Sequence, residues 1–137
     1  MESQEVVVRD FALDDLERVK EIHENSGLDY KFPDLTSSLF LVTKVVEVGG
    51  IIRAAGSAYV QVECYLFMDK AEWGTPEEKL ATIRLLDREV LHSAWLQGVD
   101  CACLWLPPGM ERFGERLEEM GWSADRSGWR TFSKRTR

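Results

Sequence analysis

A short loop between a strand-like run and a long helical pattern is the first candidate for chemistry in this sequence. It lies in the stretch DKAEWGTPEEKLATIRLL, which covers residues 69–86. A strand, a loop with glycine and a helix N-terminus can together hold a phosphate, because unpaired backbone N–H groups and the helix dipole favour an anion. Lys70 supplies a positive charge in this loop, and Gly74 is its glycine. Phosphate binding is therefore the first chemistry to weigh.

The same loop also carries the signals of a helix that caps itself. Thr75 suits the N-cap position, Pro76 suits the first helical position, and Glu78 completes a capping box. A capping box uses backbone N–H groups that a phosphate would need, and Glu77 and Glu78 add negative charge beside them. We therefore expect that the loop does not hold a pyrophosphate in the usual way. We expect instead that the Thr75 hydroxyl accepts a hydrogen bond from the N–H of Glu77 or Glu78.

The composition narrows the class of protein that surrounds this loop. The 137 residues predict one domain, 1–137, and the apolar share of 45% and charged share of 30% are ordinary for a globular protein. The net charge of −7 argues against a nucleic-acid partner, which requires a clustered basic face.

No apolar run approaches the roughly 20 residues that cross a bilayer. The N-terminus MESQEVVVRD lacks the pattern of a signal peptide. We expect no membrane partner and a cytoplasmic location.

The cysteines predict neither disulfides nor a metal site. They are Cys64, Cys101 and Cys103, and no second Cys/His pair accompanies them at the spacing of a zinc site. We interpret them as buried free thiols in a reducing compartment. The sequence also contains no Ser/His/Asp set, Walker loop or metal cluster.

The pattern of apolar residues predicts alternating strands and helices. In the first half of the chain we expect a strand at Val6–Val8, a helix over 13–23 that Gly27 closes, and strands at 39–48 and 51–60 joined by Gly49 and Gly50. A further strand at Glu63–Met68 should follow, most simply antiparallel to its neighbour. In the second half we expect a helix from Thr75 to Gly98, a strand at Val99–Leu106, a helix over 110–120 capped by Gly121, and a closing hairpin of 122–125 and 129–134.

This order, β-α-βββ-α-β-α-ββ, predicts an α/β (α+β) fold. Its sheet is mixed and mainly antiparallel, with helices on the sheet faces. The strand that ends at Met68 and the strand that begins at Val99 should run parallel and splay apart at their C-terminal ends. The helix from Thr75 should form a right-handed crossover between them.

Two local motifs agree with this order. The residues EVGG at 47–50, with Gly56, are similar to the hairpin between the second and third strands of the GNAT superfamily of N-acetyltransferases. The stretch RFGERLEEMGW at 112–122 resembles the helix ending of that family. The element order from Val6 to Thr136 also resembles the family, so the resemblance covers nearly the whole chain.

The resemblance implies an acetyl-CoA-dependent transfer to an amine. It implies Glu63 as the catalytic base, which removes a proton from the acceptor. It implies cofactor contacts at these positions: Phe67, Met68, Lys70, Gly74 and Thr75. The alignment that puts Lys70 at the family's Gln/Arg position leaves Trp73 and Thr75 at its two glycine positions. The family's tyrosine acid corresponds to Leu117, for which Tyr59 or Tyr65 could substitute. Tyr30 and Phe32 could form a lid over an acceptor pocket, or could pin their loop to the core.

Two functional hypotheses follow. In the first, the protein is an acetyl-CoA-dependent N-acyltransferase that acts on an unknown amine of a small molecule or a protein. In the second, a GNAT-like domain without cofactor binding acts as a binding or regulatory module, through an aromatic-lined cleft or through a homodimer. The altered cofactor loop and Leu117 favour the second hypothesis, whereas analogy with the fold favours the first.

Overall fold

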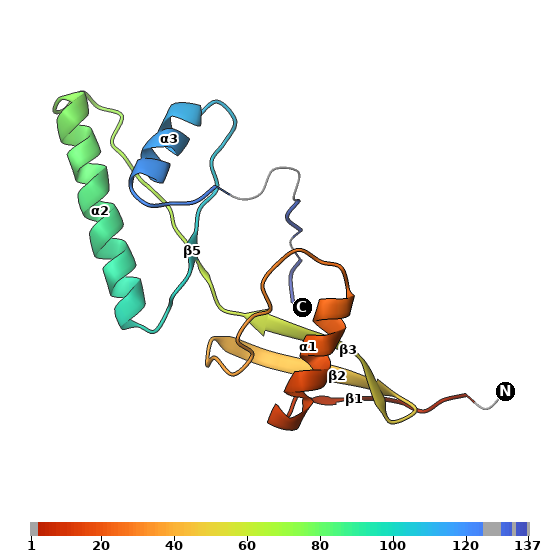
Figure 1. Cartoon of the computed structure of the whole chain (residues 1–137). Helices are drawn as coiled ribbons and strands as arrows, with labels where there is room; N and C mark the ends of the chain where they lie inside the picture. Colours follow the sequence, from red (N-terminus) through yellow and green to blue (C-terminus); the bar gives the residue numbers. More distant parts are fainter. Residues whose placement is uncertain (1–2, 125–129, 133, 137) are drawn as a thin grey trace. The chain divides into compact units, whose positions relative to one another are not determined.

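The computed structural model describes residues 3–124, 130–132 and 134–136, which belong to two compact units (Figure 1). Unit 1 consists of Met1–Val62 and Ala94–Ala102, and unit 2 consists of Glu63–Ser93 and Cys103–Arg137. The expectation of one domain over 1–137 stays a prediction.

Unit 1 is built on a sheet of three antiparallel strands. These are β1 (Val6–Asp10), β2 (Phe40–Val48) and β3 (Ile51–Tyr59), in the order β1-β2-β3. Gly49 and Gly50 form the turn between β2 and β3 with φ angles of +59° and +79°, a backbone that other residues rarely adopt. The predicted strands and the glycine turn are confirmed.

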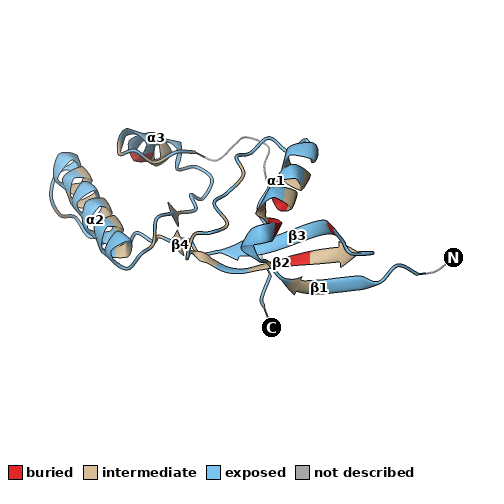
Figure 2. Cartoon of the chain, turned by 60° about the horizontal axis from the view of Figure 1, so that its bottom comes forward, coloured by how far each residue is buried: buried red, intermediate tan, exposed pale blue. Residues whose placement is uncertain are grey.

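A helix covers one face of this sheet. The short 3-10 helix η1 (Leu13–Asp15) leads into α1 (Leu16–Asn25), after which Gly27 adopts a φ of +72°. Val19 of α1 packs against Val45 of β2 and Ile52 of β3, and these three residues are the buried apolar cluster of unit 1 (Figure 2). The helical spacing of Leu16, Val19 and Ile22 places an apolar stripe toward the sheet. The predicted first helix is confirmed.

An ion-pair network ties η1 to the sheet. The Arg9 guanidinium donates hydrogen bonds of 2.7 and 2.8 Å to the two carboxylate oxygens of Asp15, and bonds of 2.7 and 2.9 Å to Oε1 of Glu47. Asp15 is buried, with 7% of its surface exposed, and its carboxylate also accepts a hydrogen bond from the N–H of Ala12. These bonds lower the pKa of Asp15 to about 2, the bond with Arg9 contributing most. A charge that is paired and hydrogen-bonded in this way can be buried.

Unit 2 contains helix α3 (Glu111–Glu119) and helix α2 (Pro76–Leu96) up to residue 93. Leu117 is the buried residue of α3, with 7% of its surface exposed. Gly121 follows α3 with a φ of +97°, which agrees with its expected role as a cap. The two predicted helices are therefore confirmed.

The strands on either side of α2 are much shorter than the sequence indicates. The strand β4 (Val62–Glu63) pairs with β5 (Ala102–Cys103) in a sheet of their own. The N–H of Val62 donates to the carbonyl of Cys101, and the N–H of Cys64 donates to the carbonyl of Cys103, at 3.1 and 2.7 Å. Because both partners advance together along the chain, the pair is parallel. The predicted parallel relationship is confirmed for these residues.

Two details of the strand prediction are wrong. Residues 64–68 and 104–106 form no strand, and β4 is not part of the antiparallel sheet that contains β3. Most apolar side chains of these segments line a cavity that is open to solvent, and several of them, such as Phe67 and Trp105, are exposed. Residues 125–129 and 133 of the predicted closing hairpin lie outside the described residues, and residues 122–124 and 130–132 adopt no strand. The protein is thus a mixed α+β structure with one antiparallel sheet and one small parallel pair.

Candidate functional site

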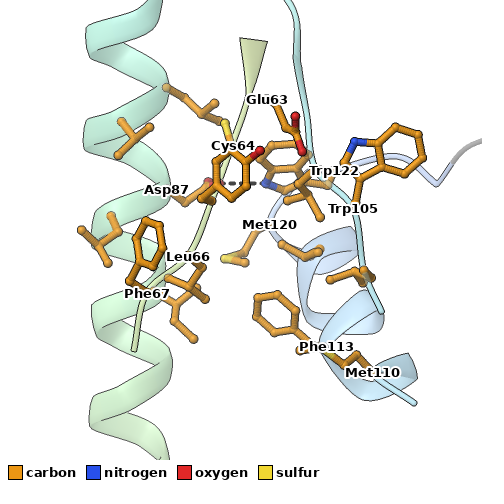
Figure 3. Close-up of a pocket in the computed structure, with 18 of the residues that line it drawn as sticks. Glu63, Cys64, Leu66, Phe67, Asp87, Trp105, Met110, Phe113, Met120 and Trp122 are labelled. Carbon is orange, nitrogen blue, oxygen red and sulfur yellow. Dashed lines mark hydrogen bonds between the residues drawn. The ribbon is translucent and has the colours of Figure 1, made fainter. Parts of the chain in front are cut away.

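Unit 2 contains an open cavity of about 590 Å³, and Figure 3 shows the side chains that line it. Its walls come from α2, from α3 and from the two segments that follow the paired strands, residues 63–67 and 104–107. The volume lies within the roughly 300–1,000 Å³ typical of pockets for small molecules. The two segments stop pairing after the backbone hydrogen bond from the N–H of Cys64 to the carbonyl of Cys103. A cavity of ligand size begins there.

Most of the cavity wall is apolar or aromatic. Helix α2 contributes side chains at positions 83, 86, 87, 90 and 91, the spacing of one helix face. Helix α3 and its flanks contribute Met110, Phe113, Leu117 and Met120, again three or four residues apart. The rings of Trp105 and Trp122 complete the wall on the side of residues 104–107 and the segment after α3. Such a surface favours an apolar ligand body.

The cavity has two carboxylates among its lining residues. Asp87 of α2 accepts a hydrogen bond of 2.7 Å from the Trp122 indole nitrogen, drawn as a dashed line in Figure 3. Glu63 lies exposed at the end of β4. Burial raises the pKa of the neighbouring Cys64 thiol, with further contributions from Cys103 and Asp87. No lysine, arginine or histidine is among the described residues that line the cavity, so its polar groups are acidic or neutral.

Glu63 lies next to a phenol. A hydrogen bond with the Glu63 carboxylate raises the pKa of Tyr65. The two residues are two positions apart in an extended segment and therefore project to the same side. The Tyr65 ring stacks on Phe67, with ring centroids 6.3 Å apart and an interplanar angle of 12°. Glu63 is exposed at the end of β4, a strand of two residues.

The start of α2 forms the predicted capping box. The Thr75 hydroxyl accepts a 3.2 Å hydrogen bond from the N–H of Glu78, and Glu78 Oε2 accepts a 2.7 Å hydrogen bond from the N–H of Thr75. Gly74 has a φ of +58°, and a Cβ atom at this position would lie 2.8 Å from Glu78 Oε2. The Glu78 carboxylate therefore lies beside Gly74, where a ligand phosphate would have to approach. The negative charge of Glu78 opposes a phosphate at this position.

The structure brings together some of the residues that sequence reasoning singled out. Glu63 and Phe67 line the cavity, and Lys70 is exposed in the loop before α2. The remaining residues of the implied cofactor contact, Met68, Gly74 and Thr75, are not among the described cavity-lining residues. Leu117 lines the cavity as a buried apolar residue.

Sequence reasoning missed the acidic group inside this cavity. Asp87 interrupts the apolar stripe of α2 between Leu86 and Val90, so its place on the helix was readable from the spacing. Its partner Trp122 lies 35 positions away, and no local pattern announces that contact.

The aromatic residues Tyr30 and Phe32 belong to unit 1 and pack on His23 of α1. The ring centroids of Tyr30 and Phe32 lie 4.6 and 5.5 Å from that of His23, and His23 Nε2 lies 2.8 Å from the carbonyl oxygen of Tyr30. Phe32 also packs against the core cluster of unit 1. Of the two roles left open by the sequence, these contacts favour pinning the loop to the core.

Within the described ranges, no group of three or more His, Cys, Asp or Glu side chains is arranged to hold a metal ion. None of the helices found in those ranges is long and apolar enough to cross a membrane. No family model, curated protein or solved structure matches the chain.

Proposed function

We propose that the protein is a binding module that takes a small apolar ligand into the cavity of unit 2. The observation that carries this proposal is the cavity itself, which has about 590 Å³ of space and mostly apolar walls. A concave apolar pocket with a few polar groups is the usual form of a small-molecule site. The proposal corresponds to a GNAT-like domain that does not depend on acetyl-CoA.

One observation supports the GNAT-like part of this proposal, and a second supports the loss of cofactor binding. The parallel pairing of β4 with β5, with α2 between them in sequence, follows the order expected from the resemblance. The self-capped start of α2 argues for the loss of cofactor binding, because Thr75 and Glu78 satisfy each other's N–H groups. The proposal keeps a cytoplasmic location, excludes nucleic acid and membrane as partners, and allows action as a homodimer.

A cavity-filling variant tests the binding proposal. Ile83 faces the cavity from α2, whereas Leu85 lies on the same helix outside the cavity and is 50% exposed. We expect phenylbutanol, an uncharged apolar probe, to bind the natural protein saturably in ligand-observed NMR. The variant Ile83→Trp should abolish this binding, and the control Leu85→Trp should retain it. Absence of binding to the natural protein, or equal binding to both variants, would contradict the proposal.

A second candidate function is N-acyl transfer from acetyl-CoA to an amine. The observation that favours it is the position of Glu63 and Tyr65, two residues apart at the cavity wall, where the Glu63 carboxylate raises the pKa of the Tyr65 phenol. Glu63 would take a proton from the ammonium form of the acceptor, as a general base does. Tyr65 would be the acid candidate in place of Leu117. Since the capping box and the charge of Glu78 oppose a diphosphate at the start of α2, this candidate requires weak binding of the donor, with Lys70 as the cation of the loop.

A further inference from the structure

We infer that the ligand of the unit 2 cavity carries one cationic ammonium group on an apolar body, and that Asp87 selects it by charge. This inference rests on the proposed binding function and adds the chemical class of the ligand. Two carboxylates, Asp87 and Glu63, line the cavity, and no basic side chain is among its described lining residues. The remaining wall is almost entirely apolar.

The charge of the cavity favours a cation over an anion. Asp87 is half-buried in an apolar surrounding, where the local dielectric constant is lower than in water and charge interactions are stronger. An anionic ligand would be repelled by Asp87 and would find no basic side chain among the described lining residues to offset its loss of water. An ammonium group would gain an ion pair there, while its apolar body would contact the side chains of α2 and α3.

The Asp87 carboxylate retains capacity for a ligand. Its contact with the Trp122 indole uses Oδ1, whereas a carboxylate has two oxygens and about four lone-pair positions. The indole N–H also fixes the orientation of the carboxylate, so little side-chain entropy is lost when a ligand binds. The rings of Trp105, Phe113 and Trp122 line the same cavity, and aromatic faces attract cations as well as apolar groups. Position, orientation and surroundings all suit an apolar ammonium ion.

Three probes of equal apolar body test the inference. Phenylbutylamine, phenylbutanol and phenylbutyrate differ in the charge of one terminal group. We expect the natural protein to bind the amine roughly tenfold more tightly than the alcohol, a ratio typical of one hydrogen bond to a charged group, and the acid most weakly. Calorimetry at neutral pH measures the three dissociation constants.

Variants then assign the charge preference. Asp87→Asn keeps an oxygen for the Trp122 indole but removes the charge, so the amine should bind within about twofold of the alcohol in this variant. Glu63→Gln, at an exposed position, is a second variant that leaves the cavity packing intact and should reduce the preference less. Glu89→Gln removes one charge from α2 outside the cavity and should have no effect.

The outcomes separate this inference from the proposed function. If the alcohol binds as tightly as the amine, or if the acid binds most tightly, the cation inference is wrong and the apolar binding function stands. A preference for the amine that persists in both Asp87→Asn and Glu63→Gln would also overturn it. If none of the three probes binds, the proposed function itself is wrong.

Discussion

The Asp87 carboxylate of α2 accepts a hydrogen bond of 2.7 Å from the indole nitrogen of Trp122, a residue 35 positions further along the chain. Both side chains are half-buried at the wall of the unit 2 cavity. This bond joins α2 to the segment that follows α3, and it gives a half-buried carboxylate a donor. A single hydrogen bond therefore serves both the packing of unit 2 and the orientation of its acidic group.

Removal of the indole donor should destabilise unit 2. We expect Trp122→Phe to lower the free energy of unfolding by about 1–3 kcal/mol, because a half-buried carboxylate loses its donor and ring contacts are lost. Urea unfolding followed by far-UV circular dichroism measures this change. The control Trp105→Phe alters a more exposed tryptophan of the same cavity, 58% exposed, and should cost less. Equal losses in the two variants would show that the hydrogen bond has no special weight.

The ion pair of Arg9 and Asp15 should make the stability of unit 1 depend on pH. The pKa of Asp15 is lowered to about 2 in the folded protein, mainly by its hydrogen bonds with Arg9. A carboxylate whose pKa is depressed by folding stabilises the protein above its unfolded pKa of about 3.9, and this contribution is lost as the pH falls toward the folded value. We therefore expect Asp15→Asn to lower the urea midpoint at pH about 7, and the difference from the natural protein to shrink between pH about 4 and 2.

A neighbouring acid provides the control for this pH dependence. Asp14 precedes Asp15 in η1 but is exposed. Asp14→Asn should leave the midpoint nearly unchanged at each pH. A loss from Asp15→Asn that is equally large at low and neutral pH would contradict the assigned role of the charge.

Local signals allowed much of the fold to be predicted. The glycine turn at Gly49 and Gly50 depends on the backbone freedom of two adjacent residues, and the start of α2 depends on the spacing between Thr75 and Glu78. Each of these features is encoded within about four residues. Features that depend only on neighbouring residues in this way can be predicted from a single sequence.

Long-range pairing could not be predicted in the same way. The apolar residues of 64–68 and 104–106 are compatible with a buried strand or with the wall of a cavity, since an apolar run of this length has no periodicity that separates the two. The pairing that decides between them joins residues about 40 positions apart, such as Cys64 and Cys103. For the same reason, the spacing of α2 could place Asp87 on the apolar face but could not identify Trp122 as its partner.

Acetyl-CoA should bind weakly, because the start of α2 is already satisfied by its own side chains. We expect a dissociation constant no tighter than high micromolar, roughly −5 to −6 kcal/mol, in a calorimetric titration. Glu78→Ala should improve the affinity by about two- to fivefold, since it frees the Thr75 N–H and removes a nearby negative charge. Glu77→Ala also removes one negative charge from the start of α2, but it does not free the Thr75 N–H, so it should improve the affinity less. Low-micromolar binding to the natural protein would restore the plain acyltransferase hypothesis.

The role of Glu63 separates the two candidate functions. If the protein transfers an acyl group to an amine, Glu63→Gln should lower turnover at neutral pH by roughly 100-fold or more, because a general base is lost. The urea midpoint should change little, since Glu63 is exposed at the end of β4. A structural role would give the reverse pattern, with reduced stability and unchanged turnover.

Two further measurements complete this test. Tyr65→Phe removes the phenol that is hydrogen-bonded to Glu63 and should lower turnover less than Glu63→Gln, because the base remains. Turnover should be followed as release of free thiol from acetyl-CoA with phenylbutylamine as acceptor. Full turnover in Glu63→Gln would place the base elsewhere. No turnover in the natural protein, together with saturable binding of the same amine, is the result expected of a binding module whose carboxylates hold the ligand without reacting with it.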